Sequence, residues 1–164
     1  MSTIEKSVEV DVPITTAYNQ WTQMESYPAF MSSVDEVKQI DDTRTHWRVN
    51  VAGVDREFDS EITDQVRDQH IAWRSIGELH HNGRVAFEEV GTDATKVTLT
   101  MEWEPEGFVE KAGDLLQIDD MTIKRDLEKF KEMIEGQGFE SGAWRGEVTG
   151  GTVTDSPDNS RDVE

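Results

Sequence analysis

The sequence contains no cysteine, which excludes a disulfide framework, a thiolate zinc site and a cysteine nucleophile. No apolar run approaches the roughly 20 residues that a membrane-spanning helix needs, so we predict no stable membrane insertion. The N-terminus, MSTIEKSVEVDVP, lacks the basic start and the apolar centre of a secretory signal peptide. These absences together predict a soluble, cytoplasmic protein.

Positive charge is also scarce. The 164 residues include 16 Lys and Arg against 35 Asp and Glu, which gives a formal net charge of −19. Such a charge repels nucleic-acid phosphates and anionic membrane surfaces, so we expect neither as a partner. The acidity fits a solvated surface that keeps the protein in solution, and it equally fits adaptation to high salt.

Motifs for nucleotide chemistry and serine hydrolysis are missing. The sequence has neither a Gly-rich phosphate loop nor a Gly-x-Ser-x-Gly nucleophile elbow. Its histidines are His46, His70, His80 and His81. Adjacent residues on a strand point to opposite faces, so His80 and His81 do not converge on one metal ion, and we expect surface histidines in a loop. We predict no metal site and no cofactor.

The first forty residues predict a strand and two short helices. Residues 3–12 alternate between apolar and polar, as in a half-buried strand. Pro13 stands where a helix can begin, and an apolar helical face follows, made of Ile14, Ala17, Tyr18 and Trp21. The Tyr27-Pro28 pair interrupts this helix, because a residue before proline avoids helical geometry.

The middle of the chain predicts a sheet. From Ser33 to Glu104 the apolar period is close to two, with turn signals at regular spacing. Asn82-Gly83 is interpreted as a turn between two strands. Together with residues 3–12, the pattern gives seven strands joined by short connections, as in an antiparallel sheet. The six further strands are predicted at Val34–Ile40, His46–Ala52, Glu57–Val66, Ile71–Ile76, Arg84–Glu89 and Lys96–Trp103.

A helical period follows from about Phe108 to Glu135, with Gly136 as a candidate C-cap. A strongly twisted sheet curls around such a helix, and we expect a cavity to remain between them. Residues 1–137 would form this domain. Residues 138–164 are acidic and Gly-rich, and we expect a disordered tail that the fold does not need, although Trp144 could dock.

Six segments between Thr3 and about Glu135 occur together in an order typical of a known family. They are VPITTAYNQWTQMESYPAFM, VDEV, IAWRSIG, NGRVAFEEV, TKVTLTMEWEPEG and IKRDLEKFKEMIE. They resemble the polyketide cyclase/dehydrase branch of the START-like superfamily, whose members are also called helix-grip or SRPBCC proteins. The resemblance implies an α+β helix-grip fold, in which a curved antiparallel sheet wraps around a long C-terminal helix. The shared motifs are structural, so no catalytic residue carries over from the resemblance.

The candidate ligand-binding residues either alternate in step with the inward-facing residues of the sheet or flank the entrance of the expected cavity. The aromatic members either pack as core or line a cavity for a flat ligand. The hydroxyls of Ser60 and Ser75 need a backbone or ligand partner if they are buried. Tyr27, Phe30 and the loop at 77–81 are expected at the entrance. The candidates are Tyr27, Phe30, Trp47, Phe58, Ser60, Trp73, Ser75, Phe87, Leu99, Met101, Leu116, Asp119 and Ile123.

Asp119 is the candidate catalytic or anchoring residue. At about 100° per residue it lies about 40° from Ile123, inside the apolar stripe of the last helix, while Asp120 lies at the edge. A buried carboxylate must be paired, hydrogen-bonded or protonated. Asp119 therefore either reaches water or an arginine at the cavity mouth, or serves as polar anchor or general acid/base.

Two functions fit these features. The first is binding of a lipid-like or aromatic polyketide-like molecule between the sheet and the last helix, in a carrier or sensor role. The alternative is a polyketide cyclase or dehydratase that uses a cavity acid/base group. Few ionisable residues share the phase of the concave face, which favours the carrier. A filled interior would instead indicate an interaction module without a ligand.

Overall fold

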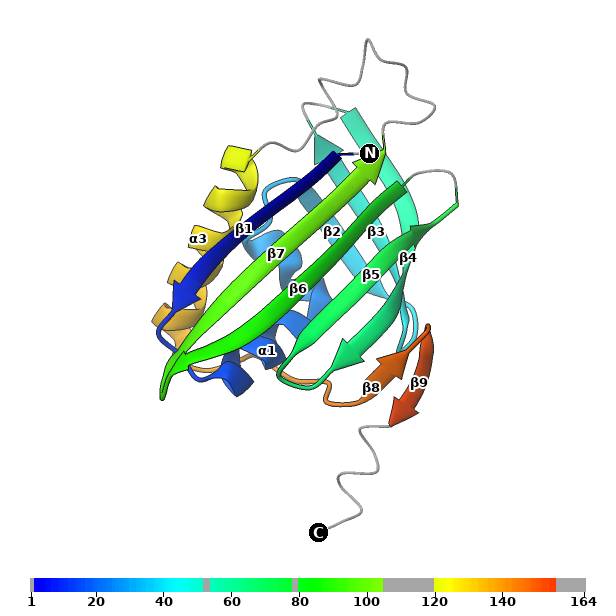
Figure 1. Cartoon of the computed structure of the whole chain (residues 1–164). Coiled ribbons are helices and arrows are strands. Elements are labelled where there is room, and N and C mark those ends of the chain that lie inside the picture. The colour runs from blue at the N-terminus through cyan, green and yellow to red at the C-terminus, as the bar shows by residue number, and fades with distance from the viewer. Residues whose placement is uncertain (1, 52–53, 78–79, 105–119, 156–164) are drawn as a thin grey trace.

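The computed structural model describes residues 2–51, 54–77, 80–104 and 120–155. One antiparallel sheet curves around the helices on its concave side (Figure 1). Its strands follow the order β1-β7-β6-β5-β4-β3-β2. The elements on this path are β1 (Ser2–Val10), β2 (Val34–Gln39), β3 (Arg44–Val51), β4 (Val54–Val66), β5 (His70–Ile76), β6 (His80–Gly91) and β7 (Ala94–Glu104).

The remaining elements cover the sheet or extend it. Two short helices, α1 (Ile14–Thr22) and the 3₁₀ helix η1 (Met24–Ala29), connect β1 to β2. After β7 come α3 (Asp120–Gln137), β8 (Glu147–Thr149) and β9 (Thr152–Asp155). The α+β helix-grip fold and the two short helices are confirmed, whereas the prediction of seven strands is wrong, because β8 and β9 bring the described strands to nine.

The helix boundaries follow local signals in the sequence. Pro13 precedes α1, and its carbonyl accepts the backbone N–H of Ala17 at 3.1 Å. At the other end of the fold, α3 ends beside Gly138, which has a φ of 76° and donates its N–H to the Ile134 carbonyl at 2.9 Å. Gly138 therefore takes the left-handed capping conformation that the sequence analysis assigned to Gly136. Of the predicted helix, residues 108–119 lie outside the described residues.

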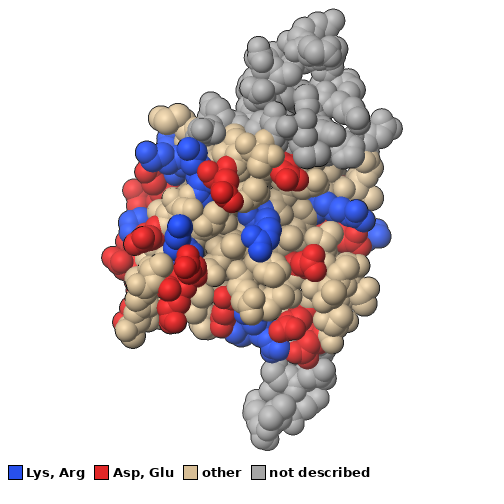
Figure 2. Space-filling view, in the orientation of Figure 1, with Lys and Arg blue, Asp and Glu red and all other residues tan. Residues whose placement is uncertain are grey.

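The convex face of the sheet is polar, and acidic and basic side chains are interspersed on it (Figure 2). Arg48 lies 3.9 Å from a carboxylate oxygen of Glu36, and Arg74 lies 3.7 Å from one of Glu61. This alternation of polar outward and apolar inward residues is what a period of two requires in an antiparallel sheet with one solvated face. Among the described helices, none is long and apolar enough to cross a membrane.

Gly83 lies within β6, so the turn predicted at Asn82-Gly83 is wrong. It stands opposite Trp73 of β5, and the indole ring lies across it. A Cβ at this position would come within 2.5 Å of Cε2 of Trp73. Glycine is therefore required here by the close approach of a neighbouring ring, a role that its sequence context does not distinguish from a turn.

The C-terminal segment (residues 139–155) is attached to the domain, contrary to the expectation of disorder from Gly138. β4 is longer than β3, and β8 pairs with the part of β4 that extends past β3, with Asp64 opposite Thr149 and Gln65 opposite Val148. Val148 is buried in the core. Pairing with an open strand edge offsets an ordering cost that the polar composition alone does not reveal.

Side chains also hold the C-terminal segment against α1. Arg145 contacts both carboxylate oxygens of Asp68, at 3.1 and 3.0 Å, and its guanidinium stacks over the ring of Tyr18 at 5.5 Å. The backbone N–H of Trp144 donates to the Thr22 hydroxyl at 3.0 Å. The suggestion that Trp144 docks is therefore confirmed. Further hydrogen bonds join Gln20 to Ser141 and Asn19 to Glu140.

Deleting residues 139–164 should destabilise the protein, because it removes buried Val148, the β8 ladder and the Arg145–Asp68 pair. We expect a loss of about 3 kcal/mol or more, or roughly 6–12 °C in Tm for a chain of this length. Thermal unfolding followed by circular dichroism measures it. The reference is the chain without residues 156–164, so that the two truncations differ only in residues 139–155; equal Tm values for the two would contradict the docking.

Gly83→Ala should destabilise the protein by about 1–3 kcal/mol, because the new methyl group overlaps the Trp73 ring and forces both strands to shift. Urea unfolding measures the change. Gly136→Ala is the matched control, since nothing lies within 4 Å of its Cβ position in α3 and alanine favours a helix by up to about 1 kcal/mol. A neutral Gly83→Ala variant would contradict the tight Trp73 contact.

Candidate functional site

Aromatic rings fill most of the concave side. Tyr27 of η1 contacts Trp47 and Trp73 of the sheet, with ring centroids 5.8 and 6.1 Å apart. Trp47 also stacks on Phe58 at 5.9 Å. Phe30 packs against Phe130 of α3 at 5.2 Å. These predicted site residues therefore come together, but as a packed cluster rather than as the wall of a large cavity.

Among the described residues, Tyr27 of η1 and the neighbouring Phe30 take up part of the space expected for the cavity. Tyr27 and Phe30 are 0% and 1% exposed, so they pack inside the domain rather than flanking an opening as expected. Phe87 lies toward α1, where its ring meets Tyr18 edge-on at 5.5 Å. Leu99 is buried in the same core. The sequence pattern correctly indicated that these residues face inward, but it could not show how much space their rings leave.

A row of polar side chains crosses the otherwise apolar concave face. Thr45 of β3 stands opposite Ser60 of β4, and Ser60 stands opposite Ser75 of β5. The Ser75 hydroxyl in turn accepts the backbone N–H of His81 on β6 at 2.9 Å. Thr45 accepts the indole N–H of Trp47 at 2.8 Å, whereas the buried hydroxyl of Ser60 has no hydrogen-bond partner.

His81 ends this row inside the protein. Its side chain is 8% exposed, and its ring lies 5.1 Å from Phe58 and 6.2 Å from Trp47. Burial lowers the pKa of His81 to about 4, so the imidazole is neutral at pH 7. Its Nδ1 atom has no hydrogen-bond partner among the residues that the structure describes. A neutral imidazole that is buried with one nitrogen unpaired is a candidate for contact with a ligand.

The sequence does not single out His81, because the turn predicted at Asn82-Gly83 places the residues before it in a loop. In β6, His81 has the same phase as Gly83 and Val85, and Val85 is fully buried. Extending the alternation of Val85 and Phe87 backward through Gly83 would have put His81 on the concave face. The turn assignment concealed that signal.

Asp126 of α3 is a second buried ionisable group. It is 3% exposed, and its Oδ1 atom accepts the backbone N–H and the hydroxyl of Ser32 at 3.1 and 3.0 Å. Burial raises the pKa of Asp126, and the two bonds from Ser32 partly oppose this rise. On the helical wheel it lies about 60° from Ile123, at the edge of the apolar stripe, so the arithmetic that selected Asp119 could also have found it.

A small cavity joins these two groups. Its volume is about 20 Å³, space for roughly one water molecule. His81 and Met101 contribute from the sheet and Asp126 and Ile123 from α3. Met101 and Ile123 were predicted site residues, whereas Leu116 and Asp119 lie outside the described residues. The described residues that line it are Met31, Ser33, Val34, Val49, His81, Met101, Ile123 and Asp126.

A curved antiparallel sheet around a C-terminal helix, with short helices after the first strand, defines the START-like class of proteins. The chain belongs to the polyketide cyclase/dehydrase and lipid transport family, whose sequence profile matches residues 10–132. It is 49% identical over 149 residues to an uncharacterized 17.2 kDa protein of Streptomyces lincolnensis, an alignment that covers 90% of this chain and 99% of the relative.

Solved structures share the fold. A START superfamily protein from Mycobacterium smegmatis superposes with a TM-score of 0.61 and 16% identity, covering 82% of this chain and 95% of that protein. The Zhui aromatase/cyclase from a Streptomyces species gives a TM-score of 0.63 and 16% identity, covering 83% and 92%. At such identities the likeness concerns the fold.

The histidines should titrate in different pH ranges. Hydrogen bonds to Asp59 and then Glu57 raise the pKa of half-buried His46 above its ordinary value, whereas the pKa of His81 falls to about 4. We expect the His46 ring signal to move at a midpoint above about pH 6.5 and that of His81 to stay constant down to about pH 5. NMR titration of the ring protons measures both midpoints, and a His81 midpoint above pH 6 would contradict its burial.

The same shift predicts how stability depends on pH. Between about pH 4 and 6.5 the unfolded chain protonates His81 while the folded chain does not. The contribution of His81 to stability is therefore complete above pH 6.5 and is lost as the pH falls through this window. Urea unfolding of the wild type and of His81→Leu at pH 7 and pH 5 isolates the effect, because the variant lacks it.

Proposed function

We propose that this protein binds an apolar small molecule between the concave face of the sheet and α3, with His81 as its polar anchor. Membership of the polyketide cyclase/dehydrase and lipid transport family supports a ligand-binding or cyclase role. We choose His81 as the anchor because its Nδ1 atom is unpaired among the described residues and lies at a cavity that is otherwise largely apolar.

Unpaired polar atoms argue against an interior that only packs. Ser60 Oγ and Trp73 Nε1 on the same face also lack partners, so the described residues leave three buried polar groups unsatisfied there. Each such group costs about 1–3 kcal/mol. A core selected for packing alone would carry apolar residues at these positions, whereas a ligand with a hydroxyl or carbonyl group would recover part of the cost.

The cavity must widen to admit a ligand, because its closed volume is about 20 Å³. Met31 and Met101 line it, and methionine side chains are long, unbranched and able to repack around an added ring. A flat aromatic ligand would then stack near Phe58 and Trp47, whose rings lie beside His81.

A matched pair of probes tests this proposal. 2-Naphthol can donate its hydroxyl to a nitrogen of the neutral His81, and naphthalene cannot. Quenching of the fluorescence of the buried tryptophans measures the two affinities. We expect 2-naphthol to bind about tenfold tighter than naphthalene, the contribution of one hydrogen bond to a buried group.

Variants locate the hydrogen bond. His81→Leu should reduce the affinity for 2-naphthol about tenfold and leave naphthalene binding within about twofold. His70→Leu is the matched control, because His70 does not line this cavity. Equal affinities of the two probes for the wild type, or equal effects of the two variants, would contradict the role of His81.

Acid–base catalysis is the second candidate, because His81 and Asp126 line the same cavity. The His81 imidazole is neutral at pH 7 and has a free nitrogen that can accept a proton, and burial raises the pKa of the Asp126 carboxyl group at the same cavity. Such a pair could move protons of a ketone ligand, as a cyclase or dehydratase requires. The structure thus supplies inward ionisable groups that the sequence analysis found to be few.

Acetophenone separates the two candidates. Exchange of its methyl protons in D2O requires proton abstraction beside the carbonyl, and NMR follows it directly. A catalytic pair predicts protein-dependent exchange that His81→Leu and Asp126→Asn each reduce by about 100-fold or more. Binding without any acceleration of exchange would favour the carrier role.

A further inference from the structure

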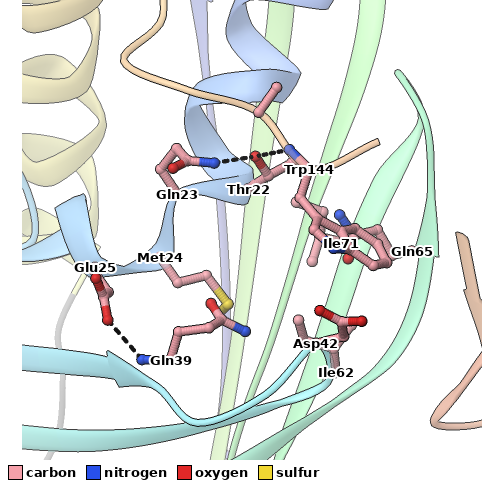
Figure 3. A pocket seen from close by; sticks show the side chains of 11 residues that line it. Thr22, Gln23, Met24, Glu25, Gln39, Asp42, Ile62, Gln65, Ile71 and Trp144 are labelled. Atoms are coloured by element: carbon pink, nitrogen blue, oxygen red, sulfur yellow. Dashed lines mark hydrogen bonds between the residues drawn. The ribbon is translucent and has the colours of Figure 1, made fainter. Parts of the chain in front are cut away.

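A second and larger pocket lies near the turn between β4 and β5, at the opposite end of these strands from His81. Its volume is about 330 Å³, within the range of small-molecule sites. Residues of α1 and η1 and of β2, β4 and β5 contribute to it, and Trp144 of the C-terminal segment closes one side (Figure 3).

Part of the pocket wall is apolar. Met24, Ile62 and Ile71 are core residues that reach the pocket surface. The half-buried ring of Trp144 completes this wall, and its backbone N–H is fixed by the hydroxyl of Thr22 at 3.0 Å. The pocket can therefore hold an apolar or aromatic body against an indole ring.

Gln65 supplies a buried polar group to the same pocket. Its side chain is 2% exposed, and its Nε2 atom donates to the hydroxyl of Tyr18 at 3.0 Å. Within the described part of the chain, its Oε1 atom has no hydrogen-bond partner. An unpaired buried carbonyl oxygen at a pocket accepts a hydrogen bond from a ligand that carries an N–H or O–H group.

The charges at this pocket have one sign. Glu25 and Asp42 line it, whereas none of the described lining residues is Lys or Arg. Glu25 is held in place by the backbone N–H of Gln39 at 2.9 Å (Figure 3). Two carboxylates in a protein with a net charge of −19 attract a cation and repel an anion.

We infer that this pocket is a second binding site, specific for a protonated amine with an apolar or aromatic body. The amine would donate to Oε1 of Gln65 and lie near the two carboxylates, while the body packs against Trp144. The proposal does not depend on the function of His81, because the two sites share no lining residue.

Three probes with the same ring test the ligand class: benzylamine, benzyl alcohol and benzoate. Saturation-transfer NMR and calorimetry on the full chain measure their binding. We expect benzylamine to bind about fivefold tighter than benzyl alcohol, the effect of weak, partly exposed ion pairs, and benzoate to bind weakest. The advantage of benzylamine should decrease as salt is added. Benzoate binding as well as benzylamine, or no binding of any probe, would overturn the proposal.

Matched variants locate the site. Asp42→Asn should weaken benzylamine binding about two- to fivefold and leave benzyl alcohol unaffected. Asp35→Asn removes the same charge from an exposed residue outside the pocket and should change neither. Equal effects of the two variants would overturn the assignment, because they would reflect only the net charge of the protein.

A direct readout of position comes from the indole N–H of Trp144, whose NMR signal is assigned by its disappearance in Trp144→Phe. Benzylamine should shift this signal in the wild type. Gln65→Leu, if it folds, should reduce the affinity of benzylamine about tenfold, as expected for one lost hydrogen bond. An unchanged Trp144 signal at saturating benzylamine would place the amine elsewhere and overturn the proposal.

Discussion

The ring of Tyr27 connects the helical segment to the sheet, and the rest of the interior is arranged around it. On one side it contacts Trp21 and Phe30, at 5.2 and 5.7 Å, and on the other Trp47 and Trp73. Its hydroxyl donates to the Trp21 carbonyl at 2.7 Å, so the phenol is buried with its donor satisfied. Burial raises the pKa of Tyr27 well above its ordinary value, and the group stays neutral. Each aromatic pair contributes about 0.5–1.5 kcal/mol beyond area burial.

This cluster determines where a ligand can act. Because rings from α1, η1 and the sheet occupy the middle of the concave side, unpaired polar groups remain at the margins of the cluster. Among the described residues, Ser60 and Trp73 each keep an unpaired atom, and His81 lies beside Phe58 of the cluster. The small cavity between His81 and Asp126 therefore lies beside the aromatic cluster.

Periodicity in the sequence was enough to predict most of the fold. Alternation located the seven strands of the main path, and Pro13 marked the start of α1. The break predicted at Tyr27-Pro28 is wrong, because the helices separate at Gln23 and both residues lie inside η1. Alternation also indicated that Trp47, Trp73 and Met101 face inward. These features are local, since each depends on the phase of a few neighbouring residues.

The features that the sequence did not yield depend on contacts between distant residues. A glycine in a turn and a glycine beneath a ring look alike until Trp73 is known to lie opposite Gly83. A turn placed at Gly83 ends the predicted strand too early. The alternation of inward-facing residues then cannot be followed back to His81. The β8 strand escaped prediction for a similar reason: its three residues are ordered by an edge of β4, more than 80 positions earlier in the chain.

The two candidate sites follow from one geometric constraint. In the middle of β4 and β5, Phe58 and Trp73 pack against Trp47, and Tyr27 of η1 lies against Trp73. At one end, His81 of the neighbouring β6 keeps an unpaired nitrogen, and at the other, Gln65 of β4 keeps an unpaired oxygen. The C-terminal segment partly closes the second end, since Trp144 and β8 lie against α1 and β4. A buried polar atom beside such an aromatic cluster, with no protein partner, can form its hydrogen bond only with a ligand or water. The opposite chemistry of the two pockets, one largely apolar beside an imidazole and one rimmed by carboxylates, then favours different occupants.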